Sequence, residues 1–479
     1  MSTQHPDNAS VPFFAASPVL AGEDEIREAY YAYSHLGCDE QMWDCEGKEI
    51  DTFVVKKLLT NYEQYFRDNR LGEDVRLTLR VPNPTVETAE AKILLETLES
   101  IPRSYDAARL FYDDDVSPIF EVILPMTTSA RCIDRIYRYY ADFIVGRQNL
   151  RFRDDDLTIA EWIGEFRPER IQVIPLFEDL ESMLAAADVV EEYLADKDVT
   201  DQRVFLARSD TAMNYGLVTA ALSNKIALWN LDRLAERRGV RLHPILGMGS
   251  APFRGGLTPR TVERVGAEYP SCVTFTIQSA FKYDYPADEV RPAIDYLERR
   301  EIGPAVPIDV ERATPIMERY SELYRRQLLD LTDTVNFLAR FVPSRRARKL
   351  HVGLFGYARQ IEGVTLPRAI SFTCAMYSAG LPPELLALEA LEAGDLAFVR
   401  EVHSSFDAKI ADALTYADPK SPLLTPELRA AILNAGYSWE PDAEHLEIVR
   451  RIREALDRGE QTQLTDLILR AALRRRFLG

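Results

Sequence analysis

Residues 171–210 read IQVIPLFEDLESMLAAADVVEEYLADKDVTDQRVFLARSD and contain one complete strand–helix–strand unit. The apolar runs Ile171–Leu176 and Arg203–Ala207 are predicted strands, and the amphipathic stretch Leu180–Ala195 between them is a predicted helix. A helix between two short buried strands is typical of a parallel βα unit. This unit therefore indicates an α/β protein whose strands run parallel.

The same unit recurs along the first 290 residues. Four further predicted strands are each followed by a turn or an amphipathic helix: Val75–Arg80, Ile119–Leu124, Arg241–Gly247 and Cys272–Ile277. A spacing of about 30–50 residues is typical of a TIM-type barrel, whose functional residues lie at the carboxyl ends of its strands. We therefore predict an α/β fold with a TIM-type (βα)8 barrel, of which six strands are recognised; a doubly wound open sheet is the alternative.

Beyond about Glu289 the pattern is helical to the end of the sequence. The predicted helices there are Pro315–Leu338, Leu385–Leu396, Phe398–Tyr416 and Ala443–Leu456. We predict two regions. Residues 1–290 form the catalytic barrel with an N-terminal active-site segment, and residues 291–479 form an extensive α-helical C-terminal half that packs on the barrel and completes the active site.

Composition and charge narrow the classes of function. Hydrophobic residues make up 46% of the chain and the formal net charge is −19, so a globular protein is expected, and nucleic acid is excluded as a partner. The longest apolar stretches are about ten residues, which excludes a membrane span. The polar N-terminus and five scattered cysteines favour a reduced, cytoplasmic protein. A protein this acidic can bind an anionic substrate only where arginines gather locally.

Two carboxylates follow predicted strands directly, Glu178 after Ile171–Leu176 and Asp210 after Arg203–Ala207. If these strands are neighbours, both side chains face the same mouth of the barrel. Two hard oxygen ligands with the other positions open to water and substrate are how Mg²⁺ is usually held. The alternative is that each is a helix cap or a first-turn acid, which is common at such positions.

Arginines occur at several of the same strand and loop ends. Arg80 ends a predicted strand, and Arg254 lies in the glycine-rich segment Gly247–Gly256, whose backbone can approach an anion closely. Arg359 and Arg368 lie in a loop that enters a helix at about Pro367, where an arginine is unfavourable unless an anion lies beside it. An ordinary salt bridge is the alternative for each. His5, within the first ten residues, would by position alone be part of a frayed tail.

Taken together, these segments resemble the archaeal-type phosphoenolpyruvate carboxylase family. The resemblance spans essentially the whole chain, and its motifs follow in the family's order: STQHPDN from Ser2, QMWDCEGK from Gln41, LTLRVPNP from Leu77, VIPLFED from Val173, ARSDTAMNYG from Ala207, GMGSAPFRGGL from Gly247, TIQSAFKYD from Thr276 and LPRAI from Leu366. Several motifs in order are far more specific than any one of them.

The resemblance implies a role for each candidate residue. His5, Arg254 and Arg368 would be catalytic, and Glu178 and Asp210 would hold Mg²⁺, for which Mn²⁺ can substitute. The residues implied to bind substrate are Arg80, Arg359, Gly255 and Gly256. A catalytic His5 requires the N-terminal segment to fold back onto the barrel mouth.

The chain departs from the long bacterial and plant members of the family at two positions. Met213 stands where those enzymes carry a lysine after the metal aspartate, and Met248 stands where they carry an earlier arginine in the glycine-rich loop. The contacts of those cations with bicarbonate or phosphate must come from elsewhere. Lys282 and Arg208 are the candidates, and the sequence does not choose between them.

The reaction implied is the carboxylation of phosphoenolpyruvate with bicarbonate to oxaloacetate and phosphate, by a cytoplasmic homotetramer with no membrane partner. Two other hypotheses remain open. A barrel lyase or mutase acting on phosphoenolpyruvate or a 2-oxo acid would share the barrel and the metal carboxylates, but it would not need bicarbonate. A non-enzymatic scaffold or regulator would bind no Mg²⁺.

Overall fold

A parallel β-sheet of seven strands forms the centre of the molecule. The computed structural model describes residues 1–45, 51–86, 91–347, 360–361 and 364–479. Each strand pairs in parallel with the next along the chain. The strands are β1 (Glu40–Asp44), β2 (Arg76–Arg80), β3 (Glu121–Leu124), β4 (Gln172–Phe177), β5 (Asp201–Leu206), β6 (Arg241–Leu246) and β7 (Thr274–Phe275). A short antiparallel pair, β8 (Gln360–Ile361) and β9 (Val364–Thr365), lies apart from this sheet.

The six strands predicted from the sequence correspond to β2–β7, within a few residues at each end. The strand of the seven-stranded sheet that was not predicted is β1, whose sequence EQMWD has no apolar alternation although all five residues are buried. Its charges are neutralised by arginines from other strands. Glu40 pairs with Arg203 at 2.7 Å, and Asp44 pairs with Arg80 at 2.8 Å. The burial of these charges is tolerated because each carboxylate forms an ion pair with an arginine, although that arginine is distant in sequence.

The first residues of the chain lie between the two edges of the sheet. Ser2 forms parallel bridges with both Gln41 in β1 and Ile277 just after β7. On one side the Ser2 N–H donates to the Glu40 carbonyl at 2.7 Å, and on the other the Thr3 N–H donates to the Ile277 carbonyl at 3.0 Å. The segment before His5 is therefore held by backbone hydrogen bonds on both sides, and it is not a frayed tail.

The side chains of the strands divide between two faces. One set packs against the surrounding helices in a large cluster that runs from Ile26 to Ala305. A separate small cluster combines Met1 with side chains from β1, β3, β4, β5 and β6 and the residue that follows β5: Met42, Ile123, Ile174, Leu176, Phe205, Ala207 and Ile245. Side chains from strands far apart in the sheet meet in this cluster, so the sheet is strongly curved.

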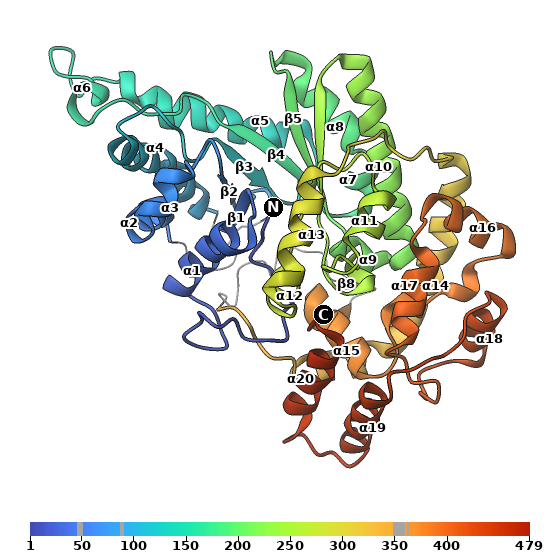
Figure 1. Cartoon of the computed structure of the whole chain (residues 1–479). Helices are drawn as coiled ribbons and strands as arrows, with labels where there is room; N and C mark the ends of the chain where they lie inside the picture. Colours follow the sequence, from blue (N-terminus) through green and yellow to red (C-terminus); the bar gives the residue numbers. More distant parts are fainter. Residues whose placement is uncertain (46–50, 87–90, 348–359, 362–363) are drawn as a thin grey trace.

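Helices cover the outer face of the sheet (Figure 1). In the first part of the chain they are α1 (Glu23–Tyr31), α2 (Val54–Asn61), α3 (Glu63–Asp68), α4 (Ile93–Tyr112), α5 (Ala130–Arg138), α6 (Ile159–Ile163), α7 (Leu180–Leu184), α8 (Ala186–Tyr193), α9 (Ser209–Tyr215), α10 (Leu217–Arg238), α11 (Val262–Glu268), α12 (Ser279–Tyr283) and α13 (Ala287–Arg299). Short π- or 3₁₀-helical segments are η1 (Ala32–Leu36), η2 (Tyr139–Val145), η3 (Gly146–Asn149), η4 (Leu194–Asp196) and η5 (Pro252–Arg254). Helix α10 ends at Arg238, with Gly239 in the left-handed conformation.

The rest of the described chain is helical apart from the β8–β9 pair. Its helices are α14 (Val310–Ala339), α15 (Ala369–Ser378), η6 (Pro383–Leu385), η7 (Leu388–Ala390), α16 (Ala393–Val402), α17 (Phe406–Leu414), α18 (Pro426–Asn434), α19 (Ala443–Asp457) and α20 (Leu464–Arg475). They pack in a second large hydrophobic cluster, which also takes side chains from α9 and α10. Helix α10 thus contributes to both cores, and the helical region packs directly on the sheet region.

Two of the predicted C-terminal helices are wrong. The stretch Leu385–Leu396 is not one helix: η6 ends at Leu385, η7 follows, and α16 begins at Ala393. Ala387 takes a left-handed conformation (φ 61°) that interrupts a helix. The stretch Phe398–Tyr416 is divided at His403 into α16 and α17.

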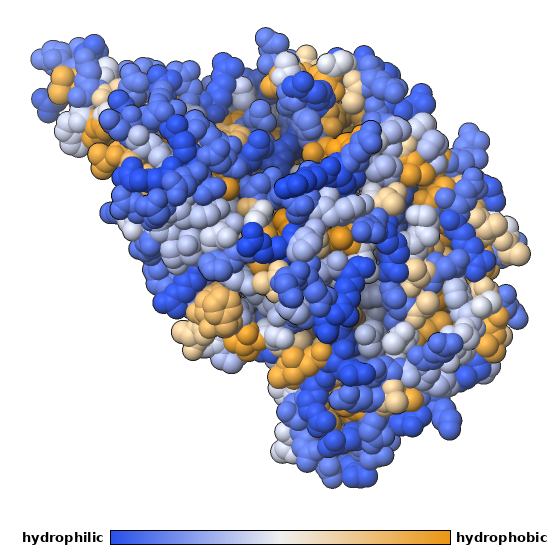
Figure 2. Space-filling view, in the orientation of Figure 1, coloured by the Kyte–Doolittle hydropathy of each residue, from blue (hydrophilic) through white to orange (hydrophobic). Residues whose placement is uncertain are grey.

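Most of the visible molecular surface is hydrophilic (Figure 2), in keeping with a net charge of −19. Within the described ranges, no helix combines the length and the apolar character needed to span a membrane.

Candidate active site

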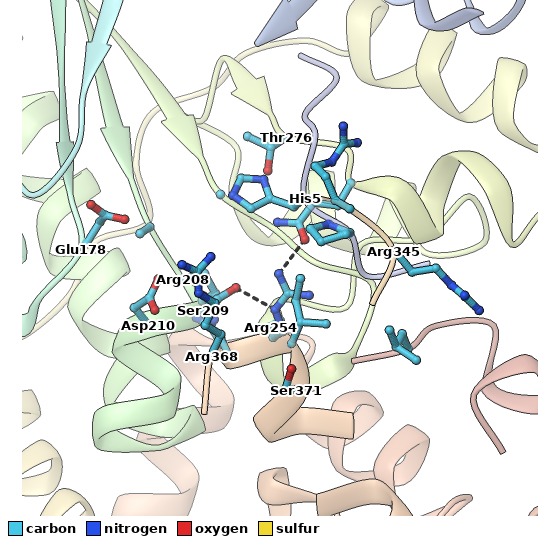
Figure 3. A pocket seen from close by; sticks show the side chains of 18 of the residues that line it. His5, Glu178, Arg208, Ser209, Asp210, Arg254, Thr276, Arg345, Arg368 and Ser371 are labelled. Atoms are coloured by element: carbon cyan, nitrogen blue, oxygen red, sulfur yellow. Dashed lines mark hydrogen bonds between the residues drawn. The ribbon is translucent and has the colours of Figure 1, made fainter. Parts of the chain in front are cut away.

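A cavity of about 370 Å³ lies at the carboxyl ends of the strands. Three parts of the chain line it: the N-terminal segment, residues at the ends of strands or in the loops after them, and the helical region. From these three parts the cavity takes His5; then Arg80, Glu178, Arg208, Ser209, Asp210, Arg254 and Gln278; and then Arg345, Arg346, Arg368 and Ser371. Figure 3 shows Glu178 and Asp210 on one side of the pocket and His5 on another, with Arg208 between them in this view.

The two candidate metal ligands lie at the ends of neighbouring strands, as predicted. Glu178 directly follows β4 and is buried, and its Oε2 accepts a hydrogen bond from the Met126 N–H at 2.7 Å. Asp210 lies in the first turn of α9, after β5. The Thr211 hydroxyl donates to the Glu178 carbonyl at 2.9 Å and joins the two segments. Both carboxylates therefore line one cavity, whatever helix-end role they also have.

This pair of side chains fits a hard divalent cation. Among the residues that the structure describes, no group of three or more His, Cys, Asp or Glu side chains could hold a metal ion. A site on Glu178 and Asp210 would therefore draw two protein carboxylates and leave its other positions to water and substrate, which is a ligand set that Mg²⁺ accepts.

The glycine-rich segment carries Arg254 into the cavity, and its last two glycines form a turn. Gly255 has a φ of 122° and Gly256 a φ of 71°, and a Cβ at Gly255 would collide with the Met248 sulfur. Neither glycine is among the residues described as lining the cavity. That they contact substrate stays a prediction. In the fold they form a turn with positive φ, which glycine adopts easily, directly after Arg254.

Arg254 is 2% exposed and donates hydrogen bonds from all three of its nitrogens. Its Nε donates to the Ser209 hydroxyl at 3.0 Å, and its Nη2 donates to the Gln278 side-chain oxygen at 2.6 Å. Its Nη1 donates to Asp7 Oδ2 at 3.3 Å and to the Gly479 backbone oxygen at 2.5 Å. Burial lowers the pKa of the Arg254 guanidinium and raises the pKa of the Asp7 carboxyl, while the charge of each partner opposes the shift of the other.

The N-terminal segment places His5 in the cavity. The His5 Nδ1 lies 3.0 Å from the Thr3 hydroxyl, and the His5 carbonyl accepts from the Ser279 N–H at 3.1 Å. Asp7 accepts from the Ala280 N–H at 2.7 Å. Since α12 starts at Ser279, this helix and the N-terminal segment fix one another. Asp7 was not singled out from the sequence, because its partner Arg254 is 247 positions away.

The other arginines predicted to bind substrate or act in catalysis differ in their positions. Arg80 makes a two-pronged pair with Asp44, with Nε–Oδ1 and Nη2–Oδ2 distances of 3.0 and 2.8 Å. Arg368 is the N-cap residue of α15 and lines the cavity, as expected for an arginine that enters a helix there. Arg359 lies outside the described residues.

The structure also distinguishes Lys282 from Arg208, the two candidates to replace the cationic side chains absent at Met213 and Met248. Lys282 is fully buried and donates to the Ser2 hydroxyl at 3.0 Å, the Thr3 carbonyl at 2.9 Å and Glu28 at 3.1 Å. It anchors the N-terminal segment and does not line the cavity described here, whereas Arg208 does. Gln278 and Ser209 were not singled out from the sequence, but the rule that polar residues after parallel strands face the site could have found them.

A buried acid holds the glycine-rich segment against the helical region and gives a testable pH effect. Glu384 Oε1 accepts from the Phe253 N–H at 2.6 Å and from the Tyr377 hydroxyl at 2.7 Å, and burial raises the pKa of Glu384 to about 7. In the unfolded chain a glutamate titrates near pH ~4.3. Between these values the folded state holds a proton that the unfolded state has lost, so this residue's contribution to stability falls as pH rises through the window.

We expect Glu384→Gln to remove this pH dependence, because glutamine keeps the accepting oxygen and cannot ionise. The difference in melting temperature between variant and wild type should increase in favour of the variant from pH 5 to pH 8. The increase should correspond to on the order of 2 kcal/mol of unfolding free energy. Calorimetry at both pH values measures it. Parallel pH profiles for the two proteins would contradict the raised pKa.

Comparison with known proteins agrees with the family that the sequence motifs resemble. The family model described as phosphoenolpyruvate carboxylase matches residues 1–479. The chain is 57% identical over 479 residues to the phosphoenolpyruvate carboxylase of Methanothermobacter thermautotrophicus, covering 100% of this chain and 99% of that protein. It is 55% identical to that of Methanospirillum hungatei, with the same coverage.

Among solved structures, an HpcH/HpaI aldolase from Desulfitobacterium hafniense aligns with a TM-score of 0.32 and 16% identity, over 58% of this chain and 84% of that one. The likeness is too low to carry an argument about this chain. The match along the full sequence is decisive. The chain belongs to the phosphoenolpyruvate carboxylase family, in its short archaeal-type form.

Proposed function

We propose that this protein carboxylates phosphoenolpyruvate with bicarbonate, giving oxaloacetate and phosphate. The observation that carries the proposal is the content of one cavity, in which two carboxylates, a histidine and several arginines gather on a protein of net charge −19. On so acidic a chain, arginines gathered at one cavity provide the local positive charge that an anionic substrate needs. Membership of the phosphoenolpyruvate carboxylase family indicates that the anion is phosphoenolpyruvate and that the reaction is its carboxylation.

The divalent cation is Mg²⁺, for which Mn²⁺ can substitute, held by Glu178 and Asp210. When bound, it supplies a Lewis acid beside the oxygens of the substrate and stabilises the charge of an enolate. Arg80, Arg254, Arg359 and Arg368 supply positive charge that neutralises the phosphoryl and carboxylate groups of the substrates.

The reaction proceeds in two steps. An oxygen of bicarbonate attacks phosphorus and the bond from phosphorus to the enol oxygen breaks, which gives carboxyphosphate and the enolate of pyruvate. His5 then accepts the carboxyphosphate proton, so that carboxyphosphate divides into CO₂ and phosphate, and the enolate carbon captures the CO₂. Residues 1–10 help to exclude water, which would otherwise protonate the enolate to pyruvate.

The architecture that we infer is a closed eight-stranded barrel, with residues 1–3 in the position of the eighth strand. The support is that Ser2 bridges both edges of the seven-stranded sheet and that Met1 joins the inner cluster. Residues 1–290 are the barrel region and residues 291–479 the helical region that completes the site. The enzyme is a cytoplasmic homotetramer, as the family resemblance implies.

Phosphate release that requires bicarbonate is the expected result for the purified wild-type protein. Phosphate and oxaloacetate should form in equal amounts from phosphoenolpyruvate, and only with bicarbonate and Mg²⁺ both present. The measurement couples oxaloacetate to malate dehydrogenase and determines phosphate separately, in buffers freed of CO₂ and then resupplied. Turnover without bicarbonate would instead identify a lyase or mutase, and no turnover with Mg²⁺ and bicarbonate would favour a non-enzymatic role.

A further inference from the structure

Arg208 is a buried guanidinium in the cavity with unused hydrogen-bonding capacity. It is 0% exposed and lines the cavity directly before Ser209 and Asp210. Its Nη1 donates to the Tyr269 hydroxyl at 3.3 Å. Its Nε and Nη2 have no hydrogen-bond partner among the described residues. Buried donors of this kind are rarely left unsatisfied in native proteins, and the cost is greatest for a charged group.

The two unsatisfied nitrogens form one edge of the guanidinium plane, and this edge has a known use elsewhere in the same protein. Through Nε and Nη2, Arg80 binds both oxygens of Asp44, Arg241 both oxygens of Asp201, and Arg260 both oxygens of Glu289. In each case the ligand is a planar group with two oxygens on one carbon. The same edge of Arg208 is therefore shaped for a carboxylate-like anion.

A buried cluster behind the cavity fixes Arg208 and adds positive charge. Tyr269, its partner, packs under Lys225, whose ammonium lies 4.3 Å from the ring centre and donates to the Glu268 carbonyl. Lys409 pairs with Glu268 Oε2 at 3.1 Å. Burial, reinforced by the charge of Arg208, lowers the pKa of both lysines to about 8. An anion on the free edge of Arg208 would relieve this excess of positive charge.

We propose that the Nε–Nη2 edge of Arg208 binds bicarbonate, and that Tyr269 is the residue that positions it. Bicarbonate is planar and presents two oxygens on one carbon, as the aspartate and glutamate partners of the other three arginines do. Arg208 thus takes over the contact of the cations that are absent at Met213 and Met248, both of which are buried and neither of which is described as lining the cavity. The inference rests on the proposed carboxylation.

The test distinguishes an effect on the use of bicarbonate from an effect on the binding of phosphoenolpyruvate. Arg208→Gln removes the charge, and Arg208→Lys keeps the charge but lacks the two-pronged edge. In both variants kcat/KM for bicarbonate should fall roughly 10²- to 10³-fold. The dissociation constant of phosphoenolpyruvate with Mg²⁺, measured by equilibrium dialysis, should match the wild type, and this measurement also reports whether the cavity is folded.

Two further variants complete the design. Tyr269→Phe leaves the guanidinium in place and should raise KM for bicarbonate roughly two- to tenfold, with unchanged affinity for phosphoenolpyruvate. Arg241→Gln is the control, because it breaks a pair of the same geometry with Asp201 at the surface. It should change neither kcat/KM for bicarbonate nor the dissociation constant of phosphoenolpyruvate.

Weaker binding of phosphoenolpyruvate with an unchanged KM for bicarbonate would overturn the inference, and so would an Arg208→Lys variant with wild-type kinetics. Full bicarbonate kinetics in Tyr269→Phe would overturn the positioning role. If the wild-type protein releases phosphate without bicarbonate, the proposed function fails together with the inference. If the wild type depends on bicarbonate but the Arg208 variants have wild-type bicarbonate kinetics, only the inference is refuted.

Discussion

Glu178→Gln and Asp210→Asn are each expected to lower metal-dependent turnover by at least about 10³-fold, because each removes one of the two carboxylates that would hold the cation. Both substitutions keep the size of the side chain and remove only charge and ligand strength. The glutamine that replaces Glu178 keeps a side-chain oxygen that can accept from the Met126 N–H, so the local structure should persist. Steady-state rates at limiting and saturating Mg²⁺ measure the effect, and the paramagnetism of Mn²⁺ reports binding directly.

The matched control is Asp179→Asn, one position along the chain. Asp179 caps α7 by accepting from the Ser182 N–H at 3.0 Å, and it does not line the cavity described here. Asparagine also caps helices well, so stability should change little. This variant should bind Mn²⁺ as the wild type does. A near-normal rate for Glu178→Gln or Asp210→Asn at limiting Mg²⁺ would mean that the cation lies elsewhere.

The carboxylate pair was predictable because the rule behind it is local. A residue that directly follows a parallel strand lies at the same edge as its counterpart on the next strand, so recognising β4 and β5 was enough to bring Glu178 and Asp210 together. The same rule would have found Ser209 and Gln278.

What the sequence could not supply are partners that are remote along the chain. β1 reads as polar because Glu40 and Asp44 are neutralised by Arg203 and Arg80 only in the folded state. Asp7 looks like part of a tail until Arg254 is placed beside it. The sequence does not distinguish Lys282 from Arg208, but their partners in the fold do. Lys282 pairs with Glu28, whereas the Nε and Nη2 of Arg208 have no hydrogen-bond partner among the described residues.

His5→Asn should separate the two halves of the reaction. Without a base at this position, carboxyphosphate would lose its proton slowly, so oxaloacetate formation should fall roughly 10²- to 10⁴-fold. Attack of bicarbonate on phosphorus does not need this base, so some bicarbonate-dependent phosphate release should survive, with the enolate appearing as pyruvate. Oxaloacetate, pyruvate and phosphate are measured in the same samples, the first two by coupling to malate and lactate dehydrogenases.

A point variant is the sharper test of the N-terminal segment, because deleting its first ten residues would also remove the backbone pairing of Ser2 and the Asp7–Arg254 contact. Asparagine at position 5 leaves both in place. His35→Asn is the matched control, since His35 is exposed and lies outside the cavity. If oxaloacetate and phosphate decline in strict proportion in His5→Asn, the residue acts before carboxyphosphate forms. If neither declines, the base must be another group at the mouth of the barrel.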